Sequence, residues 1–356
     1  MDFQVAKDEL HRCRFLDSEP QELLDGQARL RVDGFGLSAN NITYAKFGEA
    51  MSYWSFFPAE DGWGRVPVWG FAEVSETRRP ELEVGTRVYG YLPPSSELVL
   101  DAARVDARGF IDASPHRARL PPTYNSYARA SADPIYDERH EDEQMLLRPL
   151  FFTSYLIDDF LDECELFGAG TVVLSSASSK TASALAFLLS RRDGAEVVGL
   201  TSARSVGFVE GLGVYDHVVP YEQIGELPSD RAVYVDMAGD ASVRDAVHGH
   251  YREQLAHSAV VGATHHDRMG ELPEALSGPR PMFFFAPDRA SKRAADWGRE
   301  GLEQRLADAW RPYLEWTGTW LEVLHGEGPE AVEAAYLELL DGRTDPAKAH
   351  ILSLPR

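Results

Sequence analysis

The sequence has too few cysteines for several kinds of site. Among its 356 residues only Cys13 and Cys164 are cysteines, and they do not form a C-x-x-C pair. Two unpaired cysteines cannot build a disulfide framework, and they indicate neither a structural zinc site nor a thioredoxin-like redox site. We therefore interpret both as ordinary small packing residues.

Long apolar runs are also missing. The longest, such as residues 171–174 and 282–286, fall far short of the roughly 20 residues that a membrane-spanning helix needs. The chain begins with Asp2, Lys7 and Asp8 rather than with the apolar stretch of a signal peptide. We therefore expect a cytoplasmic protein.

Positive charge is scarce in this chain. Lysine and arginine together number 35 against 57 acidic residues, which gives a formal net charge of −22. Nucleic acids and anionic membrane surfaces would repel such a chain, so a small-molecule partner is favoured. Only five of the basic residues are lysines, a composition typical of GC-rich bacterial proteins.

The length and the hydrophobic content of 44% fit two domains that each bury an interior. Between Gln27 and Leu100, short alternating apolar segments are separated by glycines, a pattern that predicts a small, strongly turned β-barrel. The predicted strands are residues 28–32, 66–69, 71–74, 87–89 and 98–100. Residues 117–143 contain prolines and many charges without a sustained period, so we expect an irregular surface insertion there.

After Leu147 the pattern changes to short apolar strands that alternate with helices. The predicted strands are 171–176, 195–200, 232–236 and 258–262, and the predicted helices are 151–166, 179–192, 205–212 and 241–251. Such alternation predicts an α/β fold with a doubly wound parallel sheet, whose ligands bind at the carboxyl ends of the strands. Residues 291–340 are expected to be helical, and 349–354 to form a closing strand.

The turn between the first strand and first helix of this repeat has the setting of a phosphate-binding loop. It reads Ser176-Ala-Ser-Ser-Lys-Thr181, without the G-x-G-x-x-G that allows a close backbone approach. We expect the hydroxyl groups of Ser176, Ser178, Ser179 and Thr181 to donate to phosphate oxygens instead. A lysine in the first turn opposes the helix dipole unless an anion is present, so Lys180 is predicted to meet a phosphate. The alternative is a solvated lysine beside serine caps.

The end of the second strand indicates which nucleotide is bound. An NAD-preferring fold commonly has an acidic residue there, whereas this chain has Ser202 and Arg204 and no acid. A hydroxyl and a guanidinium suit the 2′-phosphate of NADPH. The alternative is that both residues only cap and flank the next helix.

A nucleoside triphosphatase is a competing interpretation. Ser179-Lys-Thr181 imitates the end of a P-loop, and residues 233–236 followed by Gly239 imitate a metal-binding strand and turn. A P-loop would require glycine where Leu174 and Ser179 stand, so this interpretation is disfavoured.

Several short motifs occur in a fixed order along the chain. They are Asn40-Asn41-Ile-Thr-Tyr44, Pro67-Val-Trp-Gly70, Val84-Gly-Thr-Arg-Val-Tyr-Gly90, Leu150-Phe-Phe-Thr-Ser-Tyr155, the Ser176–Thr181 turn, Leu200-Thr-Ser-Ala-Arg204, Leu212-Gly213 and Val235-Asp-Met-Ala-Gly239. This order resembles the medium-chain dehydrogenase/reductase superfamily, in particular its zinc-free quinone and enoyl reductases. From about Arg31 to the C-terminus the chain resembles more closely a bacterial family described only as a domain of unknown function, within or beside that superfamily.

The resemblance implies a division into two domains. A β-rich, GroES-like substrate and catalytic domain is expected over residues 1–150, completed by 290–356. A Rossmann cofactor domain is expected over residues 151–289. A homodimer is left open.

The zinc-using branch of the superfamily needs cysteine, histidine and acidic ligands that this chain lacks. His116 and His140 have no partners at ligand spacing. His265 and His266 are adjacent in an extended segment, so their side chains point to opposite sides. We therefore expect no catalytic metal.

Without a metal, hydride transfer needs a hydrogen-bond donor for the anion that develops on the substrate. The resemblance places polar groups for this purpose near Asn41 and on a tyrosine shortly after it, for which Tyr44 and Tyr53 are both candidates.

The resemblance also assigns residues to the nicotinamide end of the cofactor. Thr153 and Tyr155 fall where the relatives bring the start of a helix against the nicotinamide. Ala263, Thr264 and Phe285 fall where they line its other side.

The run from Tyr44 to Trp69 is rich in aromatic residues. Such a run suits a pocket for a flat or acyl substrate, but it equally suits the packed interior of a small barrel. The sequence leaves both interpretations open.

These observations favour a zinc-independent, NADPH-dependent reductase of an activated alkene, quinone or carbonyl compound. The alternatives are a lyase or isomerase, and a non-catalytic nucleotide-binding protein, on the same fold.

Overall fold

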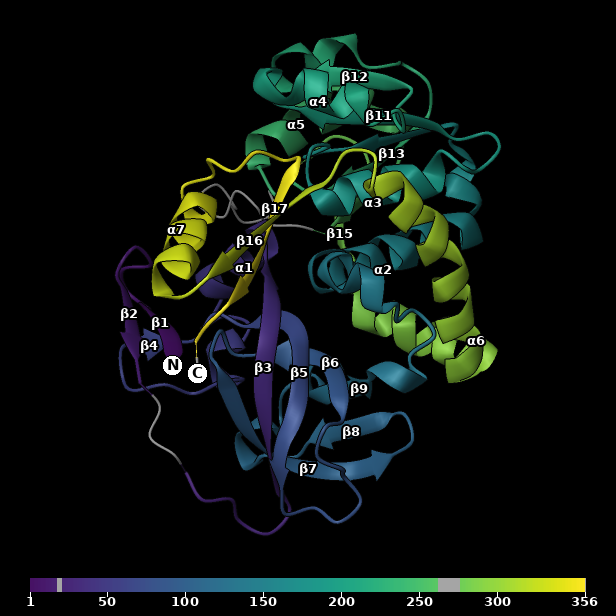
Figure 1. The fold of residues 1–356 in the computed structure, drawn as a ribbon. Helices are drawn as coiled ribbons and strands as arrows, with labels where there is room; N and C mark the ends of the chain where they lie inside the picture. The colour runs from purple at the N-terminus through teal and green to yellow at the C-terminus, as the bar shows by residue number, and fades with distance from the viewer. Residues whose placement is uncertain (18–20, 262–275, 356) are drawn as a thin grey trace. The chain divides into compact units, whose positions relative to one another are not determined.

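The computed structural model describes residues 1–17, 21–261 and 276–355. The chain divides into two units (Figure 1). Unit 1 comprises Met1–Arg148 and Leu321–Arg356, and unit 2 comprises Pro149–Trp320. Unit 1 is therefore assembled from two separate stretches of the chain, whereas unit 2 is continuous.

Unit 1 is built around a closed antiparallel barrel. Its strands are β3 (Gln27–Leu37), β5 (Val68–Thr77), β6 (Arg87–Leu92), β9 (Ser126–Arg129), β8 (Gly109–Asp112) and β7 (Glu97–Asp106). They pair in that order, and β7 also pairs with β3, which closes the ring. Alternate residues of β3 are buried, with Ala28, Leu30 and Val32 inside. The expected β-barrel is therefore confirmed.

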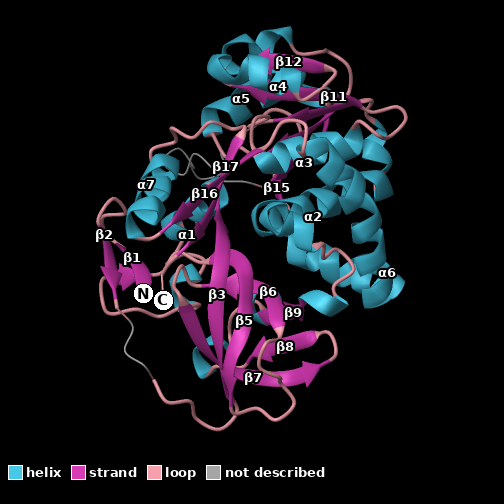
Figure 2. Ribbon diagram, viewed as in Figure 1, coloured by secondary structure: helices cyan, strands magenta, loops and turns pink. Residues whose placement is uncertain are grey.

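The remaining elements of unit 1 extend or cover the barrel. They are β1 (Asp2–Ala6), β2 (Cys13–Leu16), α1 (Ala39–Lys46), β4 (Trp63–Gly64), β16 (Glu322–Glu327), α7 (Pro329–Leu340) and β17 (Lys348–Ser353). The C-terminal strand β17 pairs antiparallel with β3 and parallel with β16, so residues from the two ends of the chain share one sheet (Figure 2).

The segment 117–143, expected to be an irregular insertion, contains strand β9, which joins β6 to β8. The side chain of Tyr127 in this strand is buried, stacks on Phe110 and donates a hydrogen bond to the carbonyl of Tyr91 at 2.8 Å. With four residues and a single buried aromatic side chain, the strand shows no alternation that could reveal it in the sequence.

Unit 2 contains a six-stranded, wholly parallel sheet. Its strands are β10 (Thr171–Leu174), β11 (Glu196–Thr201), β12 (His217–Pro220), β13 (Ala232–Asp236), β14 (Leu255–Val260) and β15 (Met282–Phe283), in the order β12-β11-β10-β13-β14-β15. The connecting helices include α3 (Lys180–Leu189), α4 (Val206–Gly211), α5 (Ala241–Tyr251) and α6 (Ala286–Thr317). This strand order is that of the doubly wound dinucleotide-binding fold, so the predicted fold class is confirmed.

The return of the chain to unit 1 occurs at Leu321 rather than at residue 290. The expected helix over 291–340 is in fact two helices, α6 and α7, separated by strand β16. Trp310 and Tyr313 of α6 pack against Phe151, and Tyr313 also contacts Phe187. These aromatic contacts hold the whole of α6 in unit 2.

Helix α2 (Glu141–Glu163) begins ten residues before the expected start at Phe151. Its first turn carries Glu141, Asp142 and Glu143, which the positive end of the helix dipole stabilises. No helix among the described residues combines the length and the apolar character needed to cross a membrane.

Candidate functional site

The candidate site of unit 2 lies where the order of its strands reverses. From β10 the chain proceeds outward through β11 and β12, and it then returns to the other side of β10 with β13. Ligands of open α/β sheets bind in the crevice that this reversal leaves at the carboxyl ends of the strands. The turn Ser176–Thr181 follows β10 and leads into α3 at this edge.

This turn adopts the tight geometry of a phosphate-binding loop without glycine. Ser176 has φ 52°, in the left-handed region where glycine is usually required. Ser179 caps α3, and its hydroxyl oxygen accepts a hydrogen bond from the N–H of Ala182 at 3.2 Å. Lys180 and Thr181 are the first residues of the helix, so the N–H groups of its first turn point toward this edge.

Two tyrosines hold the backbone of the turn. The N–H of Ser176 donates to the hydroxyl oxygen of Tyr221 at 2.9 Å, and the hydroxyl of Tyr215 donates to the carbonyl of Ala177 at 2.9 Å. Burial raises the pKa of Tyr221 to about 12, so its hydroxyl stays protonated. Tyr221 was not predicted from the sequence. It directly follows β12, however, and ligands of this fold bind at the carboxyl ends of the strands, so its position in the sequence is a usable signal.

Ser202 and Arg204 follow β11, the neighbour of β10, and so lie at the same edge of the sheet. The Ser202 hydroxyl lies 3.3 Å from that of Ser205, and Arg204 is exposed. The two strands bring their loops close together, because a Cβ on Gly199 of β11 would lie 2.9 Å from the methyl group of Ala177. The N–H of Ala177 also donates to the carbonyl of Leu200 at 2.9 Å, so the turn packs against the end of β11, the strand that Ser202 and Arg204 follow.

The residues assigned to the nicotinamide end are more scattered. Thr153 and Tyr155 lie in the middle of α2 and not at a helix start. Between them, the Ser154 hydroxyl donates to the carbonyl of Thr181 at 2.8 Å, so this part of α2 packs on the start of α3.

Tyr155 lies among charged groups of α2 and α6, and burial raises its pKa to about 12. Phe285 is 40% exposed and follows β15, the third strand from β10. Neighbouring strands lie roughly 4.8 Å apart, which puts Phe285 roughly 14 Å from the turn. Ala263 and Thr264, with the neighbouring His265 and His266, lie outside the described residues.

Two of the candidate hydrogen-bond donors of unit 1, Asn41 and Tyr44, differ in the hydrogen bonds that they already make. The Asn41 amide is held at both ends, because its oxygen accepts from the Ser38 N–H and its nitrogen donates to the Pro67 carbonyl, each at 2.8 Å. The Tyr44 oxygen accepts from the amide nitrogen of Asn40 at 2.7 Å. The hydroxyl hydrogen of Tyr44 is not used in that bond and can be donated elsewhere.

The aromatic run packs the interior of unit 1. Tyr44 and Tyr53 are buried with ring centroids 4.5 Å apart, and Tyr91 contacts Tyr44 edge to face. Burial raises the pKa of Tyr44 above its usual value and that of Tyr53 to about 12. Most of this run therefore has a structural role, while Trp69 is only partly buried.

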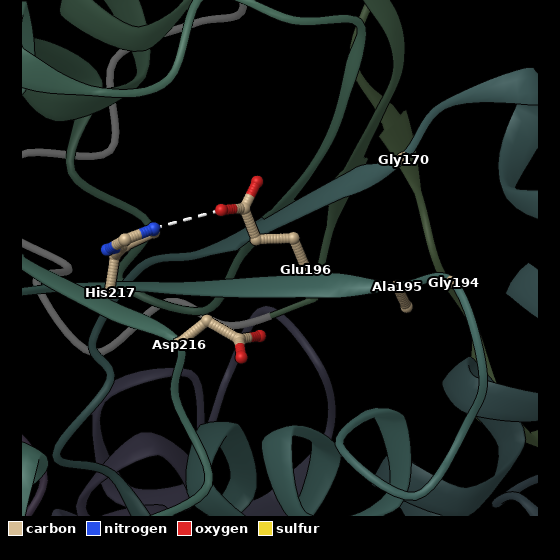
Figure 3. Close-up of a pocket in the computed structure, with 6 residues that line it drawn as sticks. All are labelled: Gly170, Gly194, Ala195, Glu196, Asp216 and His217. Carbon is tan, nitrogen blue, oxygen red and sulfur yellow. Dashed lines mark ion pairs between the residues drawn. The ribbon is translucent and has the colours of Figure 1, made fainter.

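The opposite, amino edge of the unit 2 sheet carries a shallow depression of about 540 Å³ (Figure 3). His217 and Glu196 form an ion pair there at 2.9 Å, and Asp216 accepts from the N–H of Val197 at 2.7 Å. These polar groups are engaged with each other or with the backbone, and the depression lies at the edge opposite to the one where ligands of such sheets bind. Among the described residues, no three histidine, cysteine or acidic side chains are grouped so as to hold a metal.

The chain was compared with known families and proteins. The family model described as Protein of unknown function (DUF2855) matches residues 35–345. No curated protein sequence matches the chain.

Several solved structures are similar to the chain over nearly its whole length. CurA from Vibrio vulnificus in complex with NADPH has a TM-score of 0.62 and 15% identity, covering 100% of this chain and 99% of that one. The yhdH oxidoreductase from Salmonella enterica in complex with NADP has a TM-score of 0.53 and 14% identity, with coverage of 96% and 95%. The CurF ER cyclopropanase of the curacin A pathway has a TM-score of 0.55 and 14% identity, with coverage of 99% and 97%. The likeness confirms the predicted fold, in which a β-rich domain is combined with a doubly wound parallel-sheet domain.

Proposed function

We propose that this chain, which belongs to the DUF2855 family of proteins of unknown function, is a reductase that binds NADPH at the carboxyl edge of its parallel sheet. The observation that carries the proposal is the Ser176–Thr181 turn, which joins β10 to the start of α3 beside the reversal of strand order. Two proteins of similar fold, CurA and yhdH, have structures in complex with NADPH and NADP.

We assign the phosphate groups of the cofactor to the turn Ser176–Thr181 and to the loop after β11. Ser176, Ser178, Ser179 and Thr181 would donate to the pyrophosphate together with the N–H groups at the start of α3, and Lys180 would neutralise its charge. Ser202 and Arg204 would bind the 2′-phosphate, since no acidic residue stands at the end of β11 to select an unphosphorylated ribose.

The nicotinamide end is assigned to the far side of the strand reversal. Ala263 and Thr264 follow β14 in the sequence and Phe285 follows β15, so all three come after strands on that side. Thr153 and Tyr155 are added because the segment that carries them packs on the start of α3.

NADPH, when bound, supplies a hydride to an electron-poor carbon, and negative charge then develops on the oxygen of the substrate. We assign the hydrogen bond to that oxygen to Tyr44, because Asn40 donates to the Tyr44 oxygen and leaves its hydrogen available. A pKa above the usual range keeps this hydroxyl protonated. Tyr53 is the second candidate, and Asn41 ranks third because its side chain is held toward the backbone of Ser38 and Pro67.

We further propose that the reaction needs no zinc and that the substrate is an activated alkene, a quinone or a carbonyl compound. The fold alone does not fix the reaction, because a protein named a cyclopropanase shares it. A lyase, an isomerase or a non-catalytic nucleotide-binding protein would have the same sheet and turn.

The test is a titration of the purified protein with NADPH, NADH and ATP, followed by a screen of quinones, enones and aldehydes for oxidation of NADPH. Binding of NADPH in preference to NADH and ATP, with turnover that survives dialysis against a chelator, is the expected result. Tight binding without any turnover would favour a non-catalytic nucleotide-binding protein. Preferential binding of ATP, or turnover that is lost on dialysis and restored by zinc, would contradict the proposal.

A further inference from the structure

A buried polar network lies directly beneath the candidate cofactor edge of unit 2. Its centre is Ser175, the residue between β10 and the turn, which is fully buried. The Ser175 hydroxyl donates to the carboxylate of Asp236 at 2.9 Å and accepts from the N–H groups of Met237 and Ala238, each at 3.0 Å. One side chain on β10 thus holds the backbone that follows β13.

Asp236 and Arg244 complete this network. The carboxylate of Asp236, at the end of β13, also accepts from the N–H of Gly239 at 2.9 Å, and its other oxygen lies 3.2 Å from a guanidinium nitrogen of Arg244 in α5. Asp236 is 0% exposed and Arg244 is 2% exposed. Gly239 has φ 67°, so the turn that the carboxylate holds has a left-handed residue at this position.

The network lies at the point where the strand order of the sheet reverses. Strands β10 and β13 are the two neighbours between which the strand order reverses. In this fold the two strands begin the two mononucleotide-binding halves of the domain, and a dinucleotide extends across both. Ser175 therefore connects the first half to the second at the edge where ligands of this fold bind.

We propose that Ser175, Asp236 and Arg244 are positioning residues that fix the turn after β10 relative to the turn after β13, and so set the spacing between the two halves of a bound nicotinamide dinucleotide. This inference rests on the proposed function. The three residues are buried, and in this proposal they act by holding the backbone of the site and not by binding the cofactor.

The buried charges support a role beyond stability. A buried ion pair contributes little to folding when compared with apolar residues of the same size, because both charges lose their hydration. A carboxylate without its partner at this edge would also repel phosphate groups. Arg244 cancels that charge, which allows Asp236 to serve as a triple acceptor beside an anion-binding turn.

The direct test is Ser175→Ala, measured with NADPH and with 2′,5′-ADP, which contains only the phosphorylated adenosine half. We expect the dissociation constant of NADPH to rise about tenfold, the equivalent of one lost hydrogen bond. The constant for 2′,5′-ADP should change less than about twofold, since that ligand does not extend across β13.

The matched control is Ser258→Ala. Ser258 is also fully buried in the same sheet, but its hydroxyl bonds to His248 on the far side of β13. This variant loses a buried hydrogen bond as well and should bind both ligands as the unaltered protein does. Equal weakening of the two ligands by Ser175→Ala, or no weakening of either, would overturn the proposal.

A second measurement needs no ligand. Hydrogen exchange in the ligand-free Arg244→Met variant should quicken at residues 237–239 and also at the turn after β10, because the proposal couples the two turns. Faster exchange in α5 alone would contradict the coupling. If the unaltered protein binds neither NADPH nor 2′,5′-ADP, the proposed function fails as a separate result, and the positioning role fails with it.

Discussion

The two edges of the parallel sheet in unit 2 use polar residues in opposite ways. At the amino edge, Glu196 and His217 form an exposed ion pair on the surface. At the carboxyl edge, Ser175, Asp236 and Arg244 are buried and bonded to one another, and they hold backbone N–H groups of the turn after β13. Breaking an exposed pair costs little, whereas removing one partner from a buried network is expensive. The two edges therefore differ in two respects: the polar side chains of the carboxyl edge are buried, and they fix backbone groups, whereas those of the amino edge lie on the surface.

The largest effect on binding is expected from Lys180→Ala. The dissociation constant of NADPH should rise about tenfold to a hundredfold, since a charge-assisted hydrogen bond to phosphate is lost. The ligand-free protein should be as stable as before or slightly more stable, because a cation at the start of α3 opposes the helix dipole. Calorimetry and thermal unfolding with and without NADPH measure both parts.

Arg191→Ala provides the matched control for this prediction. Arg191 lies just beyond the other end of α3 and stacks on Phe187, so its removal should leave NADPH affinity unchanged. A Lys180 variant that loses stability without ligand and keeps its affinity would show that the turn is not a phosphate site.

A smaller and selective effect is expected from Arg204→Ala. The affinity for NADPH should fall about fivefold to tenfold while the affinity for NADH stays the same, because only NADPH carries the 2′-phosphate. Parallel titrations with the two cofactors measure the ratio. An equal loss for both, or no loss, would identify Arg204 as a surface residue without a role in selectivity.

A pH effect on stability is expected from His248. Its Nδ1 lies 2.8 Å from the Ser277 carbonyl and therefore donates, which leaves Nε2 to accept from the Ser258 hydroxyl at 3.0 Å. Burial lowers the pKa of His248 below its usual value of 6.5. Since the unfolded chain then binds the proton more readily, this contribution to the free energy of unfolding is complete above pH 6.5 and is lost as the pH falls below that value.

The measurement is urea unfolding of the unaltered protein and of His248→Gln between about pH 5 and pH 7.5. Glutamine also offers one donor and one acceptor but does not titrate in this range. The stability of the variant should therefore fall less steeply in acid. Identical slopes for the two proteins would show that His248 does not contribute to the pH dependence.

The smallest effect is expected at the amino edge. Glu196→Gln removes one charge of an exposed ion pair, so the free energy of unfolding should change by less than about 1 kcal/mol. The affinity for NADPH should not change. A loss of cofactor binding in this variant would contradict the functional difference between the two edges.

The sequence predicted the fold class well because its signals are local. Short apolar strands that alternate with helices define the parallel sheet. Residues that directly follow parallel strands lie at the same edge, which locates Ser176–Thr181 and Arg204 together. Strand β9 could not be predicted in the same way, because pairing with β6 and β8 determines it rather than a pattern of its own.

The support beneath the site depends on contacts between distant residues, which no local pattern contains. In the sequence, residues 233–236 imitate a metal-binding strand, yet Asp236 accepts hydrogen bonds from Ser175 and from the Gly239 N–H. Nothing in the sequence around Arg244 distinguishes this buried residue from a charged residue on an exposed helix face. The left-handed conformation of Ser176 also could not be inferred, because sequence rules expect glycine there.

The discontinuity of unit 1 has a consequence for how the protein is made. A ribosome releases residues 149–320, the whole of unit 2, before it releases the last stretch of unit 1. Until β17 emerges, residues Phe35–Leu37 of β3 lack the strand that pairs with them on the side away from β5 in the finished protein. Unit 2 can therefore complete its sheet during synthesis, whereas the first strand made in the barrel must wait for one of the last segments of the chain.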